Sequence, residues 1–151
     1  MNELLDFSLK TEAGNLVFSL IRADECAGVF DFELSCVFVG SFSRYLPGKF
    51  SCRLYRGDIE RLIAYFFNHV QSLVLGGEES PVYVPLESDF QIKCLSGDVV
   101  DFSDGYFSMS VMFNCGVGGE GSANTYFGFE TIVDVGELSL FCEELRRISV
   151  I

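Results

Sequence analysis

The residues of this chain best suited to chemistry are a glycine-rich stretch, one histidine and many carboxylates. Gly116, Gly118 and Gly121 have the G-x-G-x-x-G spacing with which dinucleotide-binding loops cradle phosphate. Such a loop needs a helix directly after it, because the helix N-terminus holds the pyrophosphate. Here TYFGFETIV follows, which alternates like a strand, and Glu120 would repel phosphate from within the loop. The stretch therefore indicates a glycine-rich β-hairpin loop, and we predict no cofactor.

The other reactive side chains give little support to catalysis or metal binding. His69 is the only histidine, and it lies in NHVQSLV without a recognisable nucleophile motif, so we interpret it as a structural, partly buried residue. The six cysteines include no C-x-x-C pair, which argues against a zinc site. An N-terminus without signal-peptide character favours buried free thiols over disulfides. We predict no catalytic residue, no metal ligand and no enzymatic activity.

Acidic residues dominate the second part of the chain. The net charge is −12, and residues 62–145 hold 13 acidic residues against a single cation, Lys93. This balance excludes direct nucleic-acid binding, which relies on clusters of Lys and Arg. It favours a basic protein as partner, although an acidic surface could also merely keep an aromatic-rich protein soluble. The predicted partner-binding residues are Glu78, Glu79, Glu87, Asp89, Asp98, Asp101, Asp104 and Glu120.

Two kinds of periodicity divide the chain. Period-two alternation predicts four or five strands in the first 55 residues, the last of them FSCRLY. Helical spacing then begins at Gly57-Asp58, where we expect the Asp58 carboxylate to be the N-cap, and ends near Gly76. Further strands are predicted over residues 81–88, 90–96, 98–104, 106–114 and 125–133, followed by a second helix from Val135 to Ile148.

These elements predict an α+β fold, an antiparallel β-rich sandwich or curved sheet of about 8–9 strands with two helices. The second helix repeats the apolar intervals of the first at an offset of 79 residues, so that Asp58 corresponds to Glu137. No Pro- or Ser-rich linker separates the halves, so we expect residues 1–151 to form one domain. A duplication of residues 1–75 and 80–151 is a hypothesis that the pattern raises. The lack of a long apolar run and of a signal peptide predicts a cytoplasmic protein that does not enter the membrane.

The order of these parts resembles the WapI-type immunity proteins of bacterial polymorphic toxin systems. In that family a mid-chain strand runs into a helix of the pattern exxDLxxfxxxLxxL, and a C-terminal strand runs into a similar helix. Gly57–Leu73 and Glu130–Leu145 carry the match here, whereas the absence of tryptophan and the glycine-rich loop depart from it. The resemblance implies a small protein that binds and neutralises a cognate toxin domain, often a nuclease. It transfers no catalytic residue.

This implication agrees with the charge distribution. Nuclease domains tend to be basic, and an acidic inhibitor can dock where the nucleic-acid phosphates would lie. Two alternatives stay open at the level of sequence. The chain could be a small-ligand-binding or enzymatic α+β domain whose cleft gathers His69, a cysteine and a carboxylate. It could also be a structural adaptor that has no toxin partner.

Overall fold

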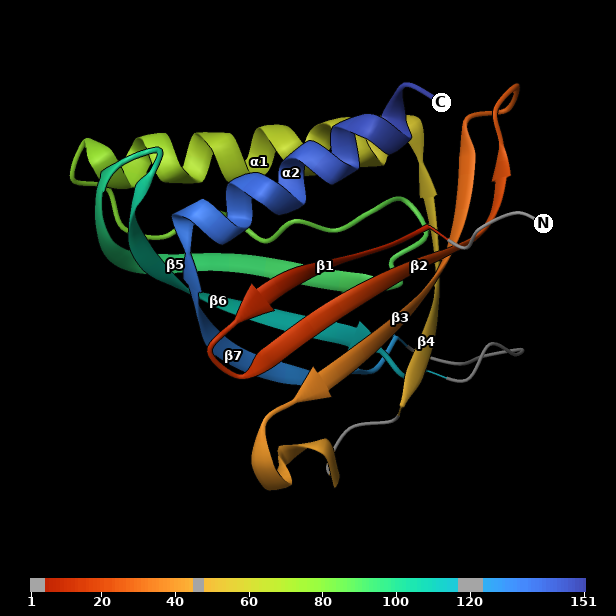
Figure 1. Ribbon diagram of the computed structural model, residues 1–151, viewed down its shortest axis with the longest axis horizontal. Helices are drawn as coiled ribbons and strands as arrows, with labels where there is room; N and C mark the ends of the chain where they lie inside the picture. Colours follow the sequence, from red (N-terminus) through yellow and green to blue (C-terminus); the bar gives the residue numbers. More distant parts are fainter. Residues whose placement is uncertain (1–4, 45–47, 117–123) are drawn as a thin grey trace.

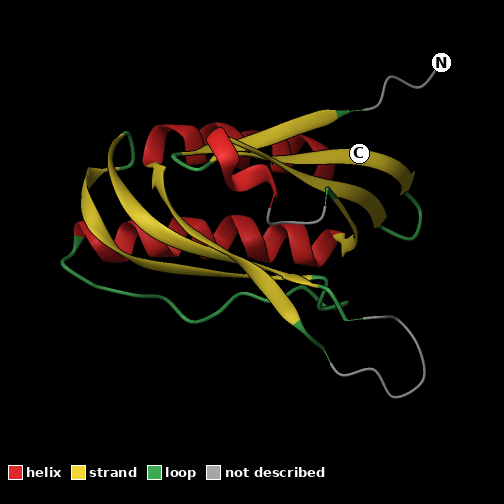
Figure 2. Ribbon diagram, turned by 90° about the horizontal axis from the view of Figure 1, so that it is seen from below, coloured by secondary structure: helices red, strands yellow, loops and turns green. Residues whose placement is uncertain are grey.

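The protein has an α+β fold of two antiparallel sheets and two helices, as the sequence predicts (Figure 1). The computed structural model describes residues 5–44, 48–116 and 124–151. Both helices lie on the same side of the two sheets (Figures 1 and 2). In chain order the elements are β1 (Asp6–Thr11), β2 (Gly14–Asp24), β3 (Val29–Phe38), the 3-10 helix η1 (Gly40–Arg44), β4 (Lys49–Tyr55), α1 (Arg56–Val74), β5 (Phe90–Asp101), β6 (Asp104–Asn114), β7 (Tyr126–Asp134) and α2 (Val135–Ser149).

The strand order in each sheet follows the chain. Strands β1 to β4 form one antiparallel sheet and β5 to β7 form the other. Alternate residues face the interior, as Leu16 and Phe18 of β2 do, so the period-two patterns mark the buried face correctly. The turn between β1 and β2 also contacts the second sheet, because the Glu12 amide donates to the Ile132 carbonyl oxygen at 3.0 Å. The two sheets are therefore joined at this corner.

Each helix reaches the sheet made by the other half of the chain. Helix α1 follows the first sheet yet lies along β5, whereas α2 follows the second sheet and lies against β1 (Figure 1). Both helices begin directly where a strand ends, at Arg56 after β4 and at Val135 after β7. These two starts are separated by the predicted offset of 79 residues. Each half of the described chain thus contains a strand that runs directly into a helix.

Phenylalanine rings fill the space between the helices and the sheets. The Phe141 ring of α2 has its centroid 5.5 Å from that of Phe7 and 5.4 Å from that of Phe18. Phe50 of the first sheet stacks on Phe113 of the second, with 4.2 Å between centroids. Each buried aromatic side chain removes roughly 150–250 Å² from water, so this cluster dominates the core. It also accounts for the high phenylalanine content of the sequence.

Asp58 organises the start of α1, but from a different position than predicted. Tyr55 is the N-cap and Asp58 is the third helical residue, where its carboxylate accepts a hydrogen bond from the Tyr55 amide at 2.9 Å. The other carboxylate oxygen accepts from Arg61 at 2.7 Å and from the Leu86 amide at 3.0 Å. The N-cap assignment is wrong because the helix begins at Arg56, so Asp58 is its third residue, and a carboxylate at that position reaches back to the amide of the N-cap residue.

The described residues form seven strands, fewer than the sequence predicts. Residues 90–96 and 98–104 belong mainly to one strand, β5, whose register shifts between Cys94 and Gly97. Gly97 suggests a turn in the sequence, but a side chain at this position would collide with the Tyr106 carbonyl oxygen of the neighbouring strand. Glycine here permits close approach of two strands rather than a reversal of the chain.

The segment 81–88 is the other strand that the sequence predicts wrongly. It contributes only an isolated bridge between Tyr83 and Ile92. Pro81 and Pro85 lack amide hydrogens and cannot donate to a ladder, which explains why no strand forms. The segment instead crosses from the end of α1 to the start of β5 as an extended connection (Figure 1).

The structure also bears on the predicted state of the cysteines and on the prediction that no segment spans a membrane. All six cysteines are free thiols, but Cys26 and Cys115 are exposed, against the expectation that they are buried. Burial raises the pKa of the Cys142 thiol to about 11 and that of Cys94 to about 12. No helix in the described part of the chain is both long and apolar enough to cross a membrane.

Candidate protein-binding surface

The acidic residues predicted to bind a partner lie at two ends of the molecule. Asp98, Asp101 and Asp104 lie around the turn between β5 and β6, next to the end of α1 (Figure 1). The segment after α1 starts with Glu78 and Glu79, runs back along the helix, and ends beside β4 with Glu87 and Asp89. Glu120 lies outside the described residues. The structure therefore does not gather this set on one continuous face.

The carboxylates at the β4 end are engaged by neighbouring groups. Glu87 accepts a hydrogen bond from the Tyr55 hydroxyl at 2.7 Å, and Asp89 accepts one from the Arg53 amide at 2.8 Å. The Arg53 guanidinium donates to both carboxylate oxygens of Asp31, which lowers the pKa of that carboxyl. Burial raises the pKa of Asp89. The negative charge at this end is thus partly compensated within the protein.

The carboxylates at the hairpin end have no such compensation. Within the residues that the structure describes, no Lys or Arg forms an ion pair with Asp98, Asp101 or Asp104. Asp101 accepts hydrogen bonds from the amide and the hydroxyl of Ser103, at 2.8 and 2.7 Å, which lower its pKa and fix the turn. Three negative charges therefore face solvent close together.

An exposed aromatic pair lies beside these carboxylates. Phe102, in the turn itself, stacks on Phe67 of α1 with 4.8 Å between ring centroids and 23° between ring planes. Phe67 is 49% exposed and Phe102 42% exposed, so the stacked rings together form an apolar patch in contact with solvent. We call Phe67, Phe102, Asp98, Asp101 and Asp104 together the aromatic–acidic surface.

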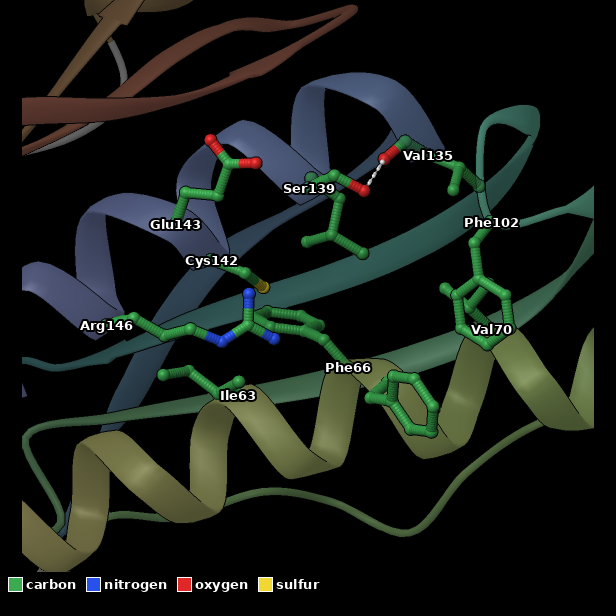
Figure 3. A pocket seen from close by; sticks show the side chains of 11 residues that line it. Ile63, Phe66, Val70, Phe102, Val135, Ser139, Cys142, Glu143 and Arg146 are labelled. Carbon is green, nitrogen blue, oxygen red and sulfur yellow. Dashed lines mark hydrogen bonds between the residues drawn. The ribbon is translucent and has the colours of Figure 1, made fainter.

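A groove opens between the two helices next to the aromatic–acidic surface. It encloses about 240 Å³; Phe66 of α1 faces Cys142 of α2 across it, and Val70 of α1 lies nearer Phe102. Phe102 reaches down from the hairpin at one end (Figure 3). Near the other end the Arg146 side chain points back over the groove toward Cys142, and it forms no ion pair with any described residue. The groove is apolar along its floor, and its charged lining residues, Glu143 and Arg146, both lie at the end away from Phe102.

Glu79 joins neither group, since its carboxylate pairs with Lys93 of β5 at 3.4 Å. Both partners are substantially exposed, so solvent screens this pair strongly and it contributes little to stability. Glu79 is grouped with the other predicted acidic residues because nothing in the sequence indicates that Lys93 lies next to it in the fold. Of the seven predicted residues that the structure describes, only the three aspartates of the hairpin combine exposure, mutual proximity and an aromatic neighbour.

His69 has a structural environment. It is fully buried, and its Nε2 lies 2.9 Å from the Leu95 carbonyl oxygen, which can only accept, so Nε2 carries the hydrogen. Nδ1 then accepts from the Ser80 hydroxyl at 2.7 Å. Burial lowers the pKa of His69 and keeps the ring neutral. His69 does not line the groove, and the described residues contain no group of three His, Cys, Asp or Glu side chains that could hold a metal ion.

The glycine-rich stretch connects two paired strands. β6 and β7 are antiparallel, with Asn114 opposite Tyr126, which confirms the predicted hairpin. A strand therefore follows the glycines where a dinucleotide site would need a helix. Of the three fingerprint glycines, only Gly116 lies within the described residues. The base of this hairpin lies near the β4 end, since the Tyr126 hydroxyl donates to the Ser88 carbonyl oxygen at 3.0 Å.

No protein-family model matches this sequence, and no curated protein matches it. The resemblance to WapI-type immunity proteins therefore stays a prediction, and the geometry of the aromatic–acidic surface is the main observation that bears on function. Sequence reasoning did not find the Phe67–Phe102 pair or the groove. One signal for them was present, because Phe102 is a large apolar residue between acidic residues in a predicted turn.

Proposed function

We propose that this protein is an immunity-type inhibitor that binds and neutralises a basic, nuclease-type toxin domain in the cytoplasm. The observation that carries the proposal is the half-exposed Phe67–Phe102 stack beside three carboxylates without a cationic partner among the described residues. Protein interfaces typically combine aromatic anchors in their centre with a polar rim. The aromatic–acidic surface has both parts within one hairpin and one helix end.

Inhibition follows from occlusion of the partner. A nuclease site binds phosphates with Lys and Arg side chains, and a cluster of carboxylates can dock against the same cations. Uncompensated negative charge also accelerates encounter with a basic protein, by up to several orders of magnitude at low salt. The imbalance of 13 acidic residues against one cation over residues 62–145 supports this role. No bond is made or broken in the partner, so the inhibitor needs no catalytic group.

The groove supports a protein partner better than a small ligand. Small-molecule sites typically enclose roughly 300–1,000 Å³ and gather several polar groups. The groove between α1 and α2 is smaller, at about 240 Å³, and its floor is apolar. A hollow of about 550 Å³ beside β4 is large enough for a small ligand and is lined by Cys52, Arg53 and four carboxylates, but His69 does not line it. The one histidine, which a catalytic cleft of the alternative kind would need, is buried in bonds to Ser80 and Leu95 instead.

Co-expression tests the proposal. The C-terminal domain encoded by the gene next to this one should arrest growth of a bacterial host when expressed alone. Growth should recover, and the two proteins should co-purify, when the present chain is expressed with it. A variant with Phe67→Ala and Phe102→Ala should give weaker rescue at equal abundance. Failure of the unaltered chain either to rescue growth or to co-purify would reject the immunity function for that pair.

A further inference from the structure

We infer that the groove between α1 and α2 is an anchor site that receives one large apolar side chain from a cation-bearing segment of the partner. The inference rests on the proposed function and deepens it, because it specifies the chemistry of the partner at the adjoining surface. Phe66, Val70 and Leu138 supply the apolar floor, and Phe102 closes the hairpin end. Such a pocket is where interfaces concentrate their binding energy.

The size of the groove favours a single side chain as its occupant. About 240 Å³ is too small for a typical drug-sized ligand, yet it suits one Leu, Met or aromatic side chain. The walls are pre-formed, since Phe102 is held against Phe67 by stacking and its turn is fixed by the Asp101 hydrogen bonds to Ser103. A pre-formed pocket loses little conformational entropy on binding, which increases affinity.

The charges around the groove define the neighbours of that side chain. Asp101 and Asp104 flank Phe102, so a Lys or Arg of the partner at this end would meet both carboxylates and an exposed aromatic face. At the other end Arg146 offers a guanidinium without an ion-pair partner among the described residues, which suits a backbone carbonyl oxygen, because the Glu143 carboxylate also lines this end and would repel a second carboxylate. Charge complementarity thus selects a segment with its cation on the hairpin side of the anchor.

A matched pair of tryptophan variants tests the groove without deleting any core contact. Ser139 lines the groove, whereas its neighbour Leu140 does not line it and is 57% exposed. Ser139→Trp places an indole over the groove, and Leu140→Trp adds the same indole outside it. Because the chain contains no tryptophan, each variant also carries a single fluorophore. Emission at shorter wavelength for Ser139→Trp than for Leu140→Trp would verify that its indole lies in the groove.

The first probe is the toxin domain encoded by the neighbouring gene. We expect Ser139→Trp to weaken its binding by about 30-fold or more, the level of an interface hot spot, and Leu140→Trp to leave it within about threefold of the unaltered chain. Equal binding by all three proteins would overturn the groove inference while leaving the immunity function intact. A wild-type dimer that becomes monomeric in Ser139→Trp would assign the groove to a second copy of the chain, and would also overturn the inference.

A displayed peptide library is the second probe, and it separates the two proposals. Panned on the unaltered chain and on Leu140→Trp, the library should enrich peptides with a large apolar residue and a Lys or Arg within one helical turn of it. Panned on Ser139→Trp, it should not. This result would support the groove as an anchor site even if the neighbouring toxin domain does not bind and the immunity function is rejected. The inference about the groove would be rejected if the same peptides were enriched on Ser139→Trp as on the unaltered chain, or if no peptides were enriched at all.

Discussion

Phe67 and Phe102 stack with 4.8 Å between their ring centroids, and yet nearly half of each side chain stays in contact with solvent. One ring belongs to α1 and the other to the β5–β6 turn, so the contact fixes the hairpin against the helix. A ring pair that is ordered but uncovered has already lost its conformational freedom before a partner arrives. Such a pair can bind with high affinity.

Replacing one ring at a time tests the pair. Phe67→Ala and Phe102→Ala should each weaken partner binding by at least about 10-fold, which corresponds to about 1.4 kcal/mol. Folding should lose less than the about 3–5 kcal/mol of a core Phe→Ala change, because both rings are half exposed. Phe127→Ala is the matched control, since Phe127 is also 49% exposed but lies on β7 at the opposite end of the molecule. Calorimetric titration gives the affinities, and equal losses for all three variants would contradict the assignment.

Charge reversal tests the acidic part of the surface. The double change Asp98→Lys and Asp104→Lys should slow association by about 10-fold at low salt and flatten its salt dependence, with a smaller effect on dissociation. Asp101 is left unchanged because its carboxylate fixes the turn. The control, Asp6→Lys with Glu25→Lys, alters net charge equally at exposed positions of β1 and the β2–β3 turn. Stopped-flow rates that fall equally for both double variants would indicate a general charge effect rather than a binding face.

The pH dependence of stability should reveal His69. Because burial lowers its pKa in the folded state below the ordinary 6.5, the unfolded chain binds a proton more readily. The stability that neutral His69 contributes to the folded protein is fully present above pH 6.5, and it is lost as the pH falls from 6.5 through the lowered pKa of the folded state. Between pH 7.5 and 5.5 the free energy of unfolding should therefore fall by up to about 1.4 kcal/mol through this group. Urea titrations of His69→Gln should lack this decrease, and parallel pH curves for the two proteins would contradict it.

The two helix starts offer a matched test of the buried carboxylate. Asp58→Ala should lower the free energy of unfolding by about 2–3 kcal/mol, because it removes a buried carboxylate that accepts hydrogen bonds from the Tyr55 and Leu86 amides and from Arg61. Glu137→Ala changes the corresponding residue of α2, whose side chain is only partly buried, and should cost about 0.5 kcal/mol or less. Urea denaturation at pH 7 measures both. Equal losses would mean that the bonds of Asp58 add nothing to stability.

The sequence predicts the local elements well where one periodicity is unbroken. Helix α2 begins at Val135 as expected, because the helical apolar spacing starts directly after the last strand; in the structure Asp134 is its N-cap. The prediction from sequence fails where the same residue type occurs in two different structural settings. Gly97 serves close strand approach, not a turn, and Pro85 interrupts an apolar run that alternates like a strand. Neither distinction is visible without the neighbouring strand.

The candidate site is the part that sequence predicts least. Helical spacing assigns Phe66 and Phe67 alike to the core, because the buried stripe of a helix can include two consecutive residues, as it does at His69 and Val70. Phe66 is buried and Phe67 is not. Which ring stays outside, and that Phe102 stacks on it, depends on how the hairpin curves over α1. Charge counting found the acidic residues, but only tertiary structure separates the three at the hairpin from the compensated ones near β4.

Each helix packs against the sheet formed by the other half of the chain, and this arrangement affects folding while the protein is being synthesised. Phe141 packs on Phe7, so the first strand and the last helix complete the same cluster. A ribosome adds roughly 5–20 residues per second, which leaves β1 waiting for on the order of ten seconds before α2 is made. During that interval Phe7 and the other rings of the first sheet lack their contacts with α2, so the core can be completed only after α2 has been made. Under the proposed function, a newly made chain would protect its cell only after that delay, however fast its surface then binds a partner.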